Sequence, residues 1–357
     1  MLFRSYLAGN RGFSNGISIG ILDSVLYKLW TKKGMVPYRI MEPILDKMAK
    51  WDSKRLFTGC KIDKLIHFSG YSNDLTTIFR GLSCNKTIYA HSDMEREVTE
   101  RRLVCSEILT RAYQEYDSVA VVTEGIKYIA ERMAEKLPYR TEKKANVMVA
   151  RNVIDYQRIL DLSEQELKLD NTTQINISFE RLQEILASDA TKFINVGRFS
   201  PEKGHARLLE AFDRIHKENP DTYLIIIGGR GVQYEETLRR AQELDSYDHI
   251  VIILYMSNPY ALLKQCDYFV FSSHYEGFGL VLAEADIVGV RCVSTDIDGA
   301  RLFMQTYGGT LVEDSNQGVY DGMKLCLDGK ITNTLSVDYA EYNKEAVAEF
   351  ETIAAME

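Results

Sequence analysis

Short apolar runs alternate with amphipathic segments through the second half of the chain. The apolar runs are rich in β-branched and aromatic residues and cover residues 192–196, 223–227, 250–254, 268–272 and 291–295. Segments with helical period lie between them, at residues 206–217, 234–245, 259–266 and 280–288. Strands that are apolar on both faces, each followed by a helix, are typical of a parallel sheet with right-handed crossovers. We therefore predict a doubly wound α/β domain in this half.

The first half shows the same alternation less regularly. Short strands are predicted at residues 64–68, 87–90, 118–123 and 146–150, and helices at 21–30, 96–116 and 126–137. The same fold class is expected, although no opening strand is visible. The polar stretch 170–178 marks the boundary, so we predict domains at 1–154 and 191–339, with 155–190 as a linker or insertion. A helix over residues 340–357 is expected to rejoin the first domain.

Composition narrows the class of protein. The chain has 357 residues, 45% apolar and 26% charged, which suits two soluble domains of moderate size. No apolar run approaches the roughly 20 residues of a spanning helix, and no secretory signal opens the chain. Six cysteines lie far apart without a CxxC pair, so we expect reduced, mostly buried thiols and a cytoplasmic protein. The net charge of −8 argues against nucleic-acid binding.

The charge is unevenly distributed along the chain. Residues 1–60 contain ten Lys and Arg against four Asp and Glu, a local balance of +6. One interpretation is peripheral contact with the anionic inner face of a membrane, or with a polyanionic acceptor. The other is a set of solvated helix faces.

Residues 197–204 read GRFSPEKG and follow the first predicted strand of the second half. Gly197 permits close approach to the backbone, and Arg198 and Lys203 place two cations at the mouth of the loop. Arginine offers a planar fork to phosphate oxygens and lysine a compact charge, so together they suit a diphosphate. Two surface cations around a proline turn explain the segment equally well when it is taken alone.

A second loop, residues 275–280, follows the predicted strand at 268–272. Gly277 and Gly279 precede a helix start, where free N–H groups and the positive dipole end favour an anion; glycine at such a turn also serves geometry alone. Glu284 lies in an otherwise apolar helix, where a carboxylate needs a salt bridge or a ligand hydroxyl. The loops of one open sheet meet outside the carboxyl ends of its strands, so their combination favours a ligand site.

GRFSPEKG followed by EGFGLVLAE at residues 276–284 resembles the signature of glycosyltransferase family GT4, with its two glutamates separated by seven residues. This family consists of retaining enzymes with the GT-B fold, which has two Rossmann-like domains and the active site between them. Residues 258–267 and 272–276 are similar to a bacterial branch that acts on teichoic acids and related surface polymers. The resemblance covers roughly residues 84–345 and is looser in the first domain.

The resemblance implies roles for the matching residues. Arg198 and Lys203 would hold the donor diphosphate, Glu276 the hydroxyls of the donor sugar, and Glu284 the nucleotide ribose. The backbone at residues 254–256 would border the base.

Backbone amides and one histidine complete the implied site. His91 would lie near the anomeric carbon, with a structurally satisfied histidine at a strand end as the alternative. The amides that would cradle the distal phosphate come from Gly277, Phe278, Gly279 and Leu280.

The implied reaction is transfer of a hexose or N-acetylhexosamine from a nucleotide diphosphate sugar, with UDP as the expected nucleotide, to a bacterial surface polymer or glycan. The resemblance further implies retention by front-face attack. Asp296-Ile297-Asp298 is formally a DxD sequence, but its place between a strand and Gly299 favours a turn. No His or Cys cluster has metal-ligand spacing, so we expect neither a metal nor a cofactor.

The chain also departs from the family. No apolar β run precedes residues 9–12 (GNRG), so we expect either a fragment or a diverged first domain. The usual acid after the glycine of the last binding loop is also absent, and Gly299-Ala300-Arg301-Leu302 stands in its place. Two other functions therefore stay open: a non-catalytic, glycosyltransferase-like binding subunit, and a nucleotide-sugar epimerase. A Rossmann dehydrogenase is excluded because no GxGxxG follows a strand.

Overall fold

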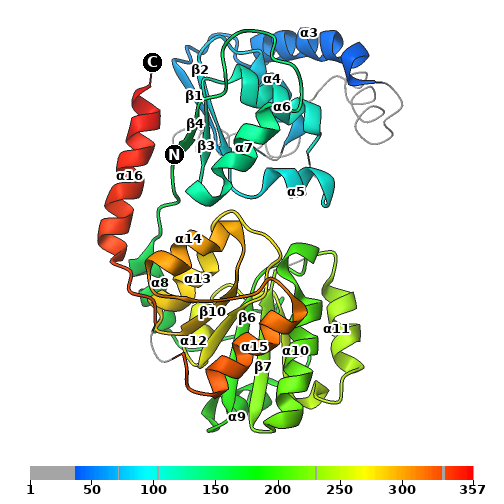
Figure 1. Ribbon diagram of the computed structural model, residues 1–357, viewed down its shortest axis with the longest axis vertical. Helices are drawn as coiled ribbons and strands as arrows, with labels where there is room; N and C mark the ends of the chain where they lie inside the picture. The colour runs from blue at the N-terminus through cyan, green and yellow to red at the C-terminus, as the bar shows by residue number, and fades with distance from the viewer. Residues whose placement is uncertain (1–36, 71, 103, 230, 332–333, 357) are drawn as a thin grey trace.

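The computed structural model describes residues 37–70, 72–102, 104–229, 231–331 and 334–356. Figure 1 shows two α/β domains, one above the other, with the long C-terminal helix running beside the upper, first domain. Within these residues no helix is long and apolar enough to cross a bilayer. The predicted helix at 21–30, the glycines at 9–12 and most of the basic stretch 1–60 lie outside the described residues.

A four-stranded parallel sheet, ordered β1-β2-β3-β4, forms the centre of the first domain. Each strand overlaps one of the predicted apolar runs. The strands are β1 (Lys64–His67), β2 (Asn85–Ala90), β3 (Ser118–Val121) and β4 (Val147–Val149). The helices are α3 (Tyr38–Leu56), α4 (Asn73–Arg80), α5 (Met94–Thr99), α6 (Ser106–Glu115) and α7 (Lys127–Ala134), with the short η1 (Glu124–Ile126).

The second domain has a seven-stranded sheet ordered β11-β10-β9-β6-β7-β8-β5. Its strands are β5 (Gln174–Ile175), β6 (Thr191–Val196), β7 (Thr222–Gly228), β8 (Ile250–Leu254), β9 (Tyr268–Phe271), β10 (Arg291–Thr295) and β11 (Thr310–Val312). Its helices are α8 (Tyr156–Ser163), α9 (Phe179–Ala187), η2 (Pro201–Lys203), α10 (His205–Glu218), α11 (Tyr234–Gln242), η3 (Tyr247–His249), α12 (Tyr260–Leu263), α13 (Leu280–Ile287), α14 (Asp298–Thr306) and α15 (Asn316–Leu327).

The strand order of the second sheet reverses direction between β6 and β9. From β6 the chain proceeds outward to β7 and β8, then returns to the other side of β6 and continues through β9, β10 and β11. These six strands are parallel to one another. The loops after β6 and β9 therefore run in opposite directions and leave a crevice at the carboxyl edge, where open α/β sheets bind ligands.

Residues 155–190, expected as a linker or insertion, contribute secondary structure to the second domain. The strand β5 pairs antiparallel with β8, and the Asn176 side chain bonds both Ile250 and Ile252 of that strand. Leu182 and Ile185 of α9 are buried.

The C-terminal helix α16 (Tyr339–Ala355) returns to the first domain. Arg151 forms ion pairs with Glu345 and Glu349 of this helix. Asn343 bonds the backbone of Ile154 through both its amide oxygen and its amide nitrogen. The chain therefore crosses between the domains twice.

The single helix expected over residues 96–116 is wrong, because the structure has two. Arg102 adopts a left-handed conformation with φ 53 between α5 and α6, and this breaks the helical run. The next helix starts after Cys105, whose backbone N–H donates to the side-chain oxygen of Asn73 at 2.7 Å. A contact from another helix, rather than a local signal, holds this second start.

Candidate functional site

The two loops singled out in the sequence flank the crevice between β6 and β9. The loop after β6 holds Gly197, Arg198 and Lys203, and the loop after β9 holds Glu276 and the glycines before α13. Parallel pairing of β6 with β9 brings the loops together across 73 residues of sequence. The structure thus unites the residues that the sequence predicted separately.

The loop after β6 is held by close backbone packing. A Cβ on Gly204, which has φ +66, would lie 2.1 Å from the carbonyl oxygen of Ser272 at the end of β9, so only glycine fits there. Gly197 lies against the aliphatic part of the Lys203 side chain. Arg198 is largely exposed and donates to Glu202 at 3.2 Å. The loop therefore presents an exposed guanidinium that pairs with one carboxylate and an ammonium that is mostly buried.

The loop after β9 leads into α13 with no side-chain cap on the helix start. Gly279 precedes the helix with φ 76 in the left-handed region, and the first N–H groups of a helix have no partner within it. The ring of Phe278 is buried and packs edge-on against Phe303, with centroids 5.0 Å apart. Phe278 can therefore contact a ligand only through its backbone, whereas Leu280 is partly exposed.

Lys203 and Glu276 form an ion pair across the crevice, with both side chains mostly buried. The ammonium also lies 5.9 Å above the ring of Phe271. In the absence of a ligand each charge thus satisfies the other. The sequence predicted a diphosphate partner for Lys203 and a sugar partner for Glu276, and did not predict that they meet.

Glu284 on α13 has a partner that the sequence did not predict. Burial raises the pKa of its carboxyl group, while a hydrogen bond from Tyr260 and the charge of Lys203 lower it. Burial and the Glu284 charge raise the pKa of the Tyr260 hydroxyl to about 12, so the hydroxyl keeps its proton and donates. The site already satisfies one lone pair of Glu284 and leaves others for a ligand.

His91 lies just beyond β2, on the side of the crevice that belongs to the first domain. Its Nε2 lies 2.6 Å from the carbonyl oxygen of Phe68. Because a carbonyl oxygen only accepts hydrogen bonds, Nε2 carries the proton of the neutral ring and Nδ1 is unprotonated. Burial lowers the pKa of His91, against the effect of this bond. The neutral histidine is oriented by Phe68, and its backbone borders the loop with Gly277.

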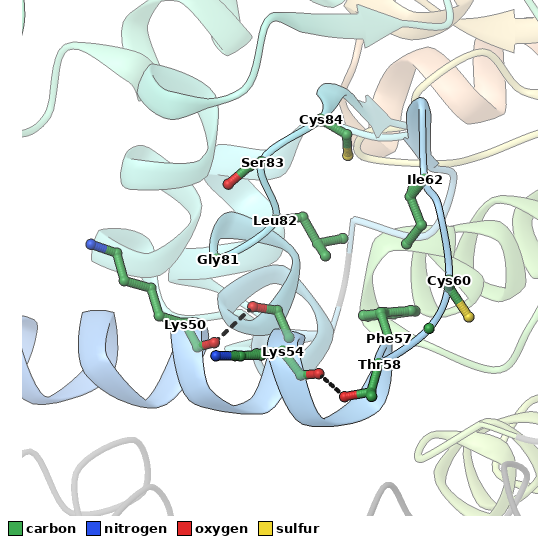
Figure 2. A pocket seen from close by; sticks show the side chains of 12 residues that line it. Lys50, Lys54, Phe57, Thr58, Cys60, Ile62, Gly81, Leu82, Ser83 and Cys84 are labelled. Carbon is green, nitrogen blue, oxygen red and sulfur yellow. Dashed lines mark hydrogen bonds between the residues drawn. The ribbon is translucent and has the colours of Figure 1, made fainter.

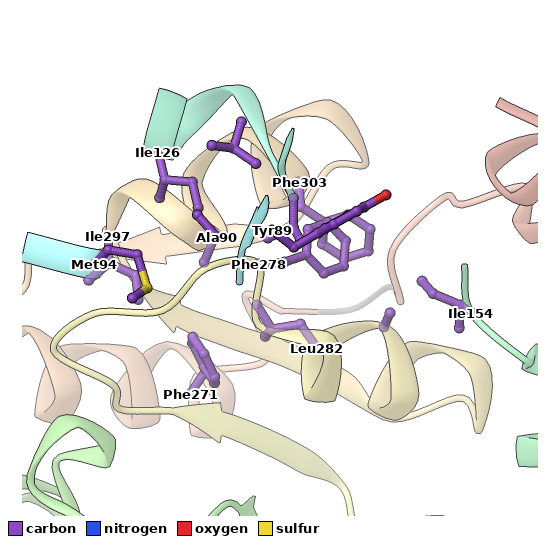
Figure 3. Close-up of a cluster of buried hydrophobic side chains, with 14 of the residues drawn as sticks. Tyr89, Ala90, Met94, Ile126, Ile154, Phe271, Phe278, Leu282, Ile297 and Phe303 are labelled. Atoms are coloured by element: carbon purple, nitrogen blue, oxygen red, sulfur yellow. The ribbon is translucent and has the colours of Figure 1, made fainter. Parts of the chain in front are cut away.

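The two domains share a buried apolar cluster beside the crevice. Met94 and Ile126 of the first domain belong to the same buried cluster as Phe278 and Ile297 of the second. Figure 3 shows these side chains together, with Phe271 below them. This packing holds the first domain against the β9–α13 loop.

A charged cluster beside the crevice contains residues that the sequence analysis did not single out. Arg101 of the first domain pairs with Glu97 at 3.0 Å and with Glu202 at 3.4 Å. Arg96 donates to the backbone oxygen of His274 at 2.9 Å. Glu202 Oε2 and the Tyr275 hydroxyl are buried without a hydrogen-bond partner among the described residues. The only sequence signal was the place of Glu202 within GRFSPEKG.

The DxD sequence engages an arginine. Arg301 donates to Asp296 and to Asp298 at 2.6 Å each, and Tyr128 of the first domain donates to Asp298. Asp296 and Ile297 lie between β10 and α14, and Asp298 begins α14. Among the described residues no group of three or more His, Cys, Asp or Glu is placed to hold a metal ion.

Two hollows adjoin the crevice. One, of 120 Å³, lies between the domains and is bordered by Glu276, His274, Arg96 and Asp93. The other, of 790 Å³, is bordered by Leu254 and Tyr255 beyond β8, next to the backbone expected at the base. The first hollow thus reaches Glu276, and the second lies at the carboxyl end of β8.

Comparison with known families matches residues 177–344 to the glycosyl transferases group 1. Over 157 residues the chain is 36% identical to the Campylobacter jejuni N-acetylgalactosamine-N,N'-diacetylbacillosaminyl-diphospho-undecaprenol 4-alpha-N-acetylgalactosaminyltransferase. That match covers 43% of this chain and 41% of the relative. The chain spans less than half the length of the curated relatives it matches.

Solved structures share the two-domain fold. The Anabaena HepE structure in complex with UDP and glucose has a TM-score of 0.62 at 15% identity, covering 87% of this chain and 80% of that one. A variant of S. aureus TarM in complex with fondaparinux, alpha-GlcNAc-glycerol and UDP also has a TM-score of 0.62, at 14% identity, covering 87% and 58%.

Proposed function

Because residues 177–344 carry the domain of the group 1 glycosyl transferases and the two domains have the GT-B fold, we propose that this chain is a retaining glycosyltransferase. It transfers a hexose or N-acetylhexosamine from a UDP sugar to a bacterial surface polymer or glycan. The observation that carries the proposal is the meeting of Lys203, Glu276 and the uncapped start of α13 at the crevice. Such a site matches a substrate with a diphosphate next to a sugar.

The ion pair between Lys203 and Glu276 prepares the site for the donor. When the diphosphate enters, Lys203 exchanges a carboxylate for phosphate oxygens, and Glu276 becomes free to accept hydrogen bonds from sugar hydroxyls. Arg198 and the N–H groups at residues 279–281 supply the remaining positive potential. Preorganised donors of this kind stabilise the charge that develops on a leaving group. Glu284, oriented by Tyr260, accepts from the ribose hydroxyls.

The reaction breaks the bond between the anomeric carbon and the donor phosphate oxygen. A bond from the acceptor oxygen to the same carbon forms on the same face, and the acceptor proton passes to the departing phosphate. His91, neutral and hydrogen-bonded to Phe68, borders the sugar from the first domain. The proposal requires no metal ion, because cationic side chains and backbone amides face the diphosphate. Support for a bacterial glycan acceptor comes from the Campylobacter relative, whose name carries a diphospho-undecaprenol saccharide.

Thermal melting with UDP, GDP, ADP and CDP tests the donor site directly. A nucleotide at 100 times its dissociation constant stabilises the folded chain by about 2.7 kcal/mol. We expect this shift with UDP and its loss in Glu284→Ala, whereas Glu184→Ala on the exposed side of α9 keeps it. No shift with any nucleotide would contradict the donor site.

Transfer assays with and without acceptor then separate the three functions. Sugar transferred only to an added glycan supports the proposal, and free sugar released without acceptor supports an epimerase. Stabilisation by UDP without turnover of any UDP sugar supports the non-catalytic binding subunit.

A further inference from the structure

The helix α3 presents apolar side chains on a face that the described fold does not cover. Ile40, Ile44 and Trp51 are exposed by 57%, 42% and 58%. Their spacing of four and seven residues places them in one stripe along the helix. The opposite face packs Met41 and Leu45 into the first domain. The helix is thus apolar on two faces. On the exposed face, the guanidinium of Arg55 from the same helix lies 5.2 Å from the centroid of the Trp51 ring.

Charge on α3 is segregated in the same way. Lys47, Lys50 and Lys54 are exposed beside the apolar stripe, and no ion pair between described residues includes them. The acidic residues of the helix are engaged instead with arginines: Glu42 with Arg111 and Arg140, Asp46 with Arg80 and Arg140, and Asp52 with Arg55. The apolar stripe therefore has an uncompensated positive border.

A hollow of 580 Å³ opens at the C-terminal end of α3, next to the stripe. Lys50 and Lys54 line it together with Phe57, Leu82 and Cys84. Figure 2 shows the apolar side chains gathered around the hollow, with the two lysines reaching from the helix. Lysine ammonium groups on one side of a hollow and apolar side chains on the other suit a phosphate that is joined to an apolar body.

We propose that α3 and this hollow dock the first domain on an anionic lipid bilayer. Trp51, Ile40 and Ile44 enter the interfacial layer, and the three lysines meet lipid phosphates. An exposed helix face that combines tryptophan and aliphatic residues with lysines lies in the plane of such an interface, and each lysine near an anionic surface adds attraction. In Figure 1 α3 lies at the outer end of the first domain, away from the second, so docking leaves the crevice accessible. The inference does not depend on the transferase reaction.

Flotation of the full chain with vesicles tests the charge. We expect binding to phosphatidylglycerol-containing vesicles and little binding to phosphatidylcholine alone. The triple variant Lys47→Gln, Lys50→Gln, Lys54→Gln should bind the anionic vesicles roughly a hundredfold more weakly. The matched control changes Lys168, Lys330 and Lys344, which are exposed on other parts of the chain, to Gln and should bind as the unaltered chain does. Equal binding by the two triple variants would overturn the proposal.

Fluorescence of Trp51 tests the apolar stripe. The chain contains two tryptophans, so Trp30→Phe leaves Trp51 as the reporter. We expect its emission to shift to the blue when anionic vesicles are added. A shift already present without vesicles would mean that the face is covered by another segment of this chain or by a second copy, and would overturn lipid docking. Loss of UDP-dependent melting with intact vesicle binding would reject the donor site alone.

Discussion

The backbone of Gly277 lies against the backbone of His91 so closely that a Cβ at Gly277 would fall 1.8 Å from the His91 carbonyl oxygen. No real Cβ contact is that short, so any side chain must move the β9–α13 loop away from the first domain. The loop that carries Glu276 is thus set by a contact with a residue 186 positions earlier.

Gly277→Ala should consequently lower the rate of sugar transfer by roughly a hundredfold, because displacements of about 1 Å in a site cost that much. The comparison is Gly289→Ala, where φ is +83 but the added Cβ meets open space. That variant should lose about 1 kcal/mol of folding free energy to backbone strain and keep its transfer rate. Steady-state rates and melting temperatures of both variants check this, and a fast Gly277→Ala enzyme would refute the importance of the contact.

Lys203→Ala and Glu276→Ala should each reduce turnover by roughly a hundredfold or more, the scale for removing a group that stabilises transition-state charge. Each change also leaves the other charge of a largely buried pair without its partner. The control is Lys264→Ala, which breaks an exposed ion pair with Glu164 and should leave turnover unaltered. Near-normal rates in both site variants would remove these residues from the mechanism.

Arg101→Gln should lower the free energy of unfolding by roughly 3 kcal/mol, because it removes the arginine partner of buried Glu97 and one of the two arginine partners of buried Glu202. Burial raises the pKa of the Glu97 carboxyl group, and the charge of Arg101 opposes this effect. Arg239→Gln removes a guanidinium from the exposed carboxylates of Glu236 and Glu243 and should leave the free energy of unfolding nearly unaltered. Urea unfolding measures both, and similar losses in the two variants would argue against a buried interdomain cluster.

Acidification should destabilise the chain through His205. Burial lowers its pKa from 6.5 to about 4, with the Lys203 charge adding to the effect. Between pH 4 and pH 6.5 the unfolded state therefore binds more protons than the folded state. The contribution of the neutral His205 ring to the free energy of unfolding is complete above pH 6.5 and is lost as the pH falls towards 4. The contribution is about 3 kcal/mol.

His205→Leu isolates that contribution. Both ring nitrogens are buried without a hydrogen-bond partner among the described residues, so an apolar replacement removes no bond. Unfolding in urea at pH 7 and at pH 5 measures how much free energy of unfolding is lost on acidification. This loss should be smaller in the variant than in the unaltered chain. An identical loss would place the acid sensitivity elsewhere, for example at His67, whose pKa burial also lowers to about 4.

The second domain was the most predictable part of the fold. Strands β8 and β10 have the predicted bounds, β6 and β9 differ from theirs by one residue at one end, and β7 is longer than predicted by one residue at each end. Parallel strands buried on both faces must be apolar throughout, and this signal is local and strong. The break at Arg102 was not predictable in the same way, since the start of α6 depends on Asn73 from another helix.

Local chemistry in the chain was sufficient to identify which side chains carry charge at the strand ends: Arg198, Lys203, Glu276 and Glu284 all lie at the crevice or on the helix that leaves it. Their partners were not predictable, because a one-dimensional pattern does not say which loops meet. Pairing of β6 with β9 joined Lys203 to Glu276, packing of α12 near α13 brought Tyr260 to Glu284, and docking of the first domain placed His91 against Gly277 and Arg101 beside Glu202. Periodicity and residue type are properties of neighbours in sequence, whereas these contacts arise only when two sheets and two domains pack together.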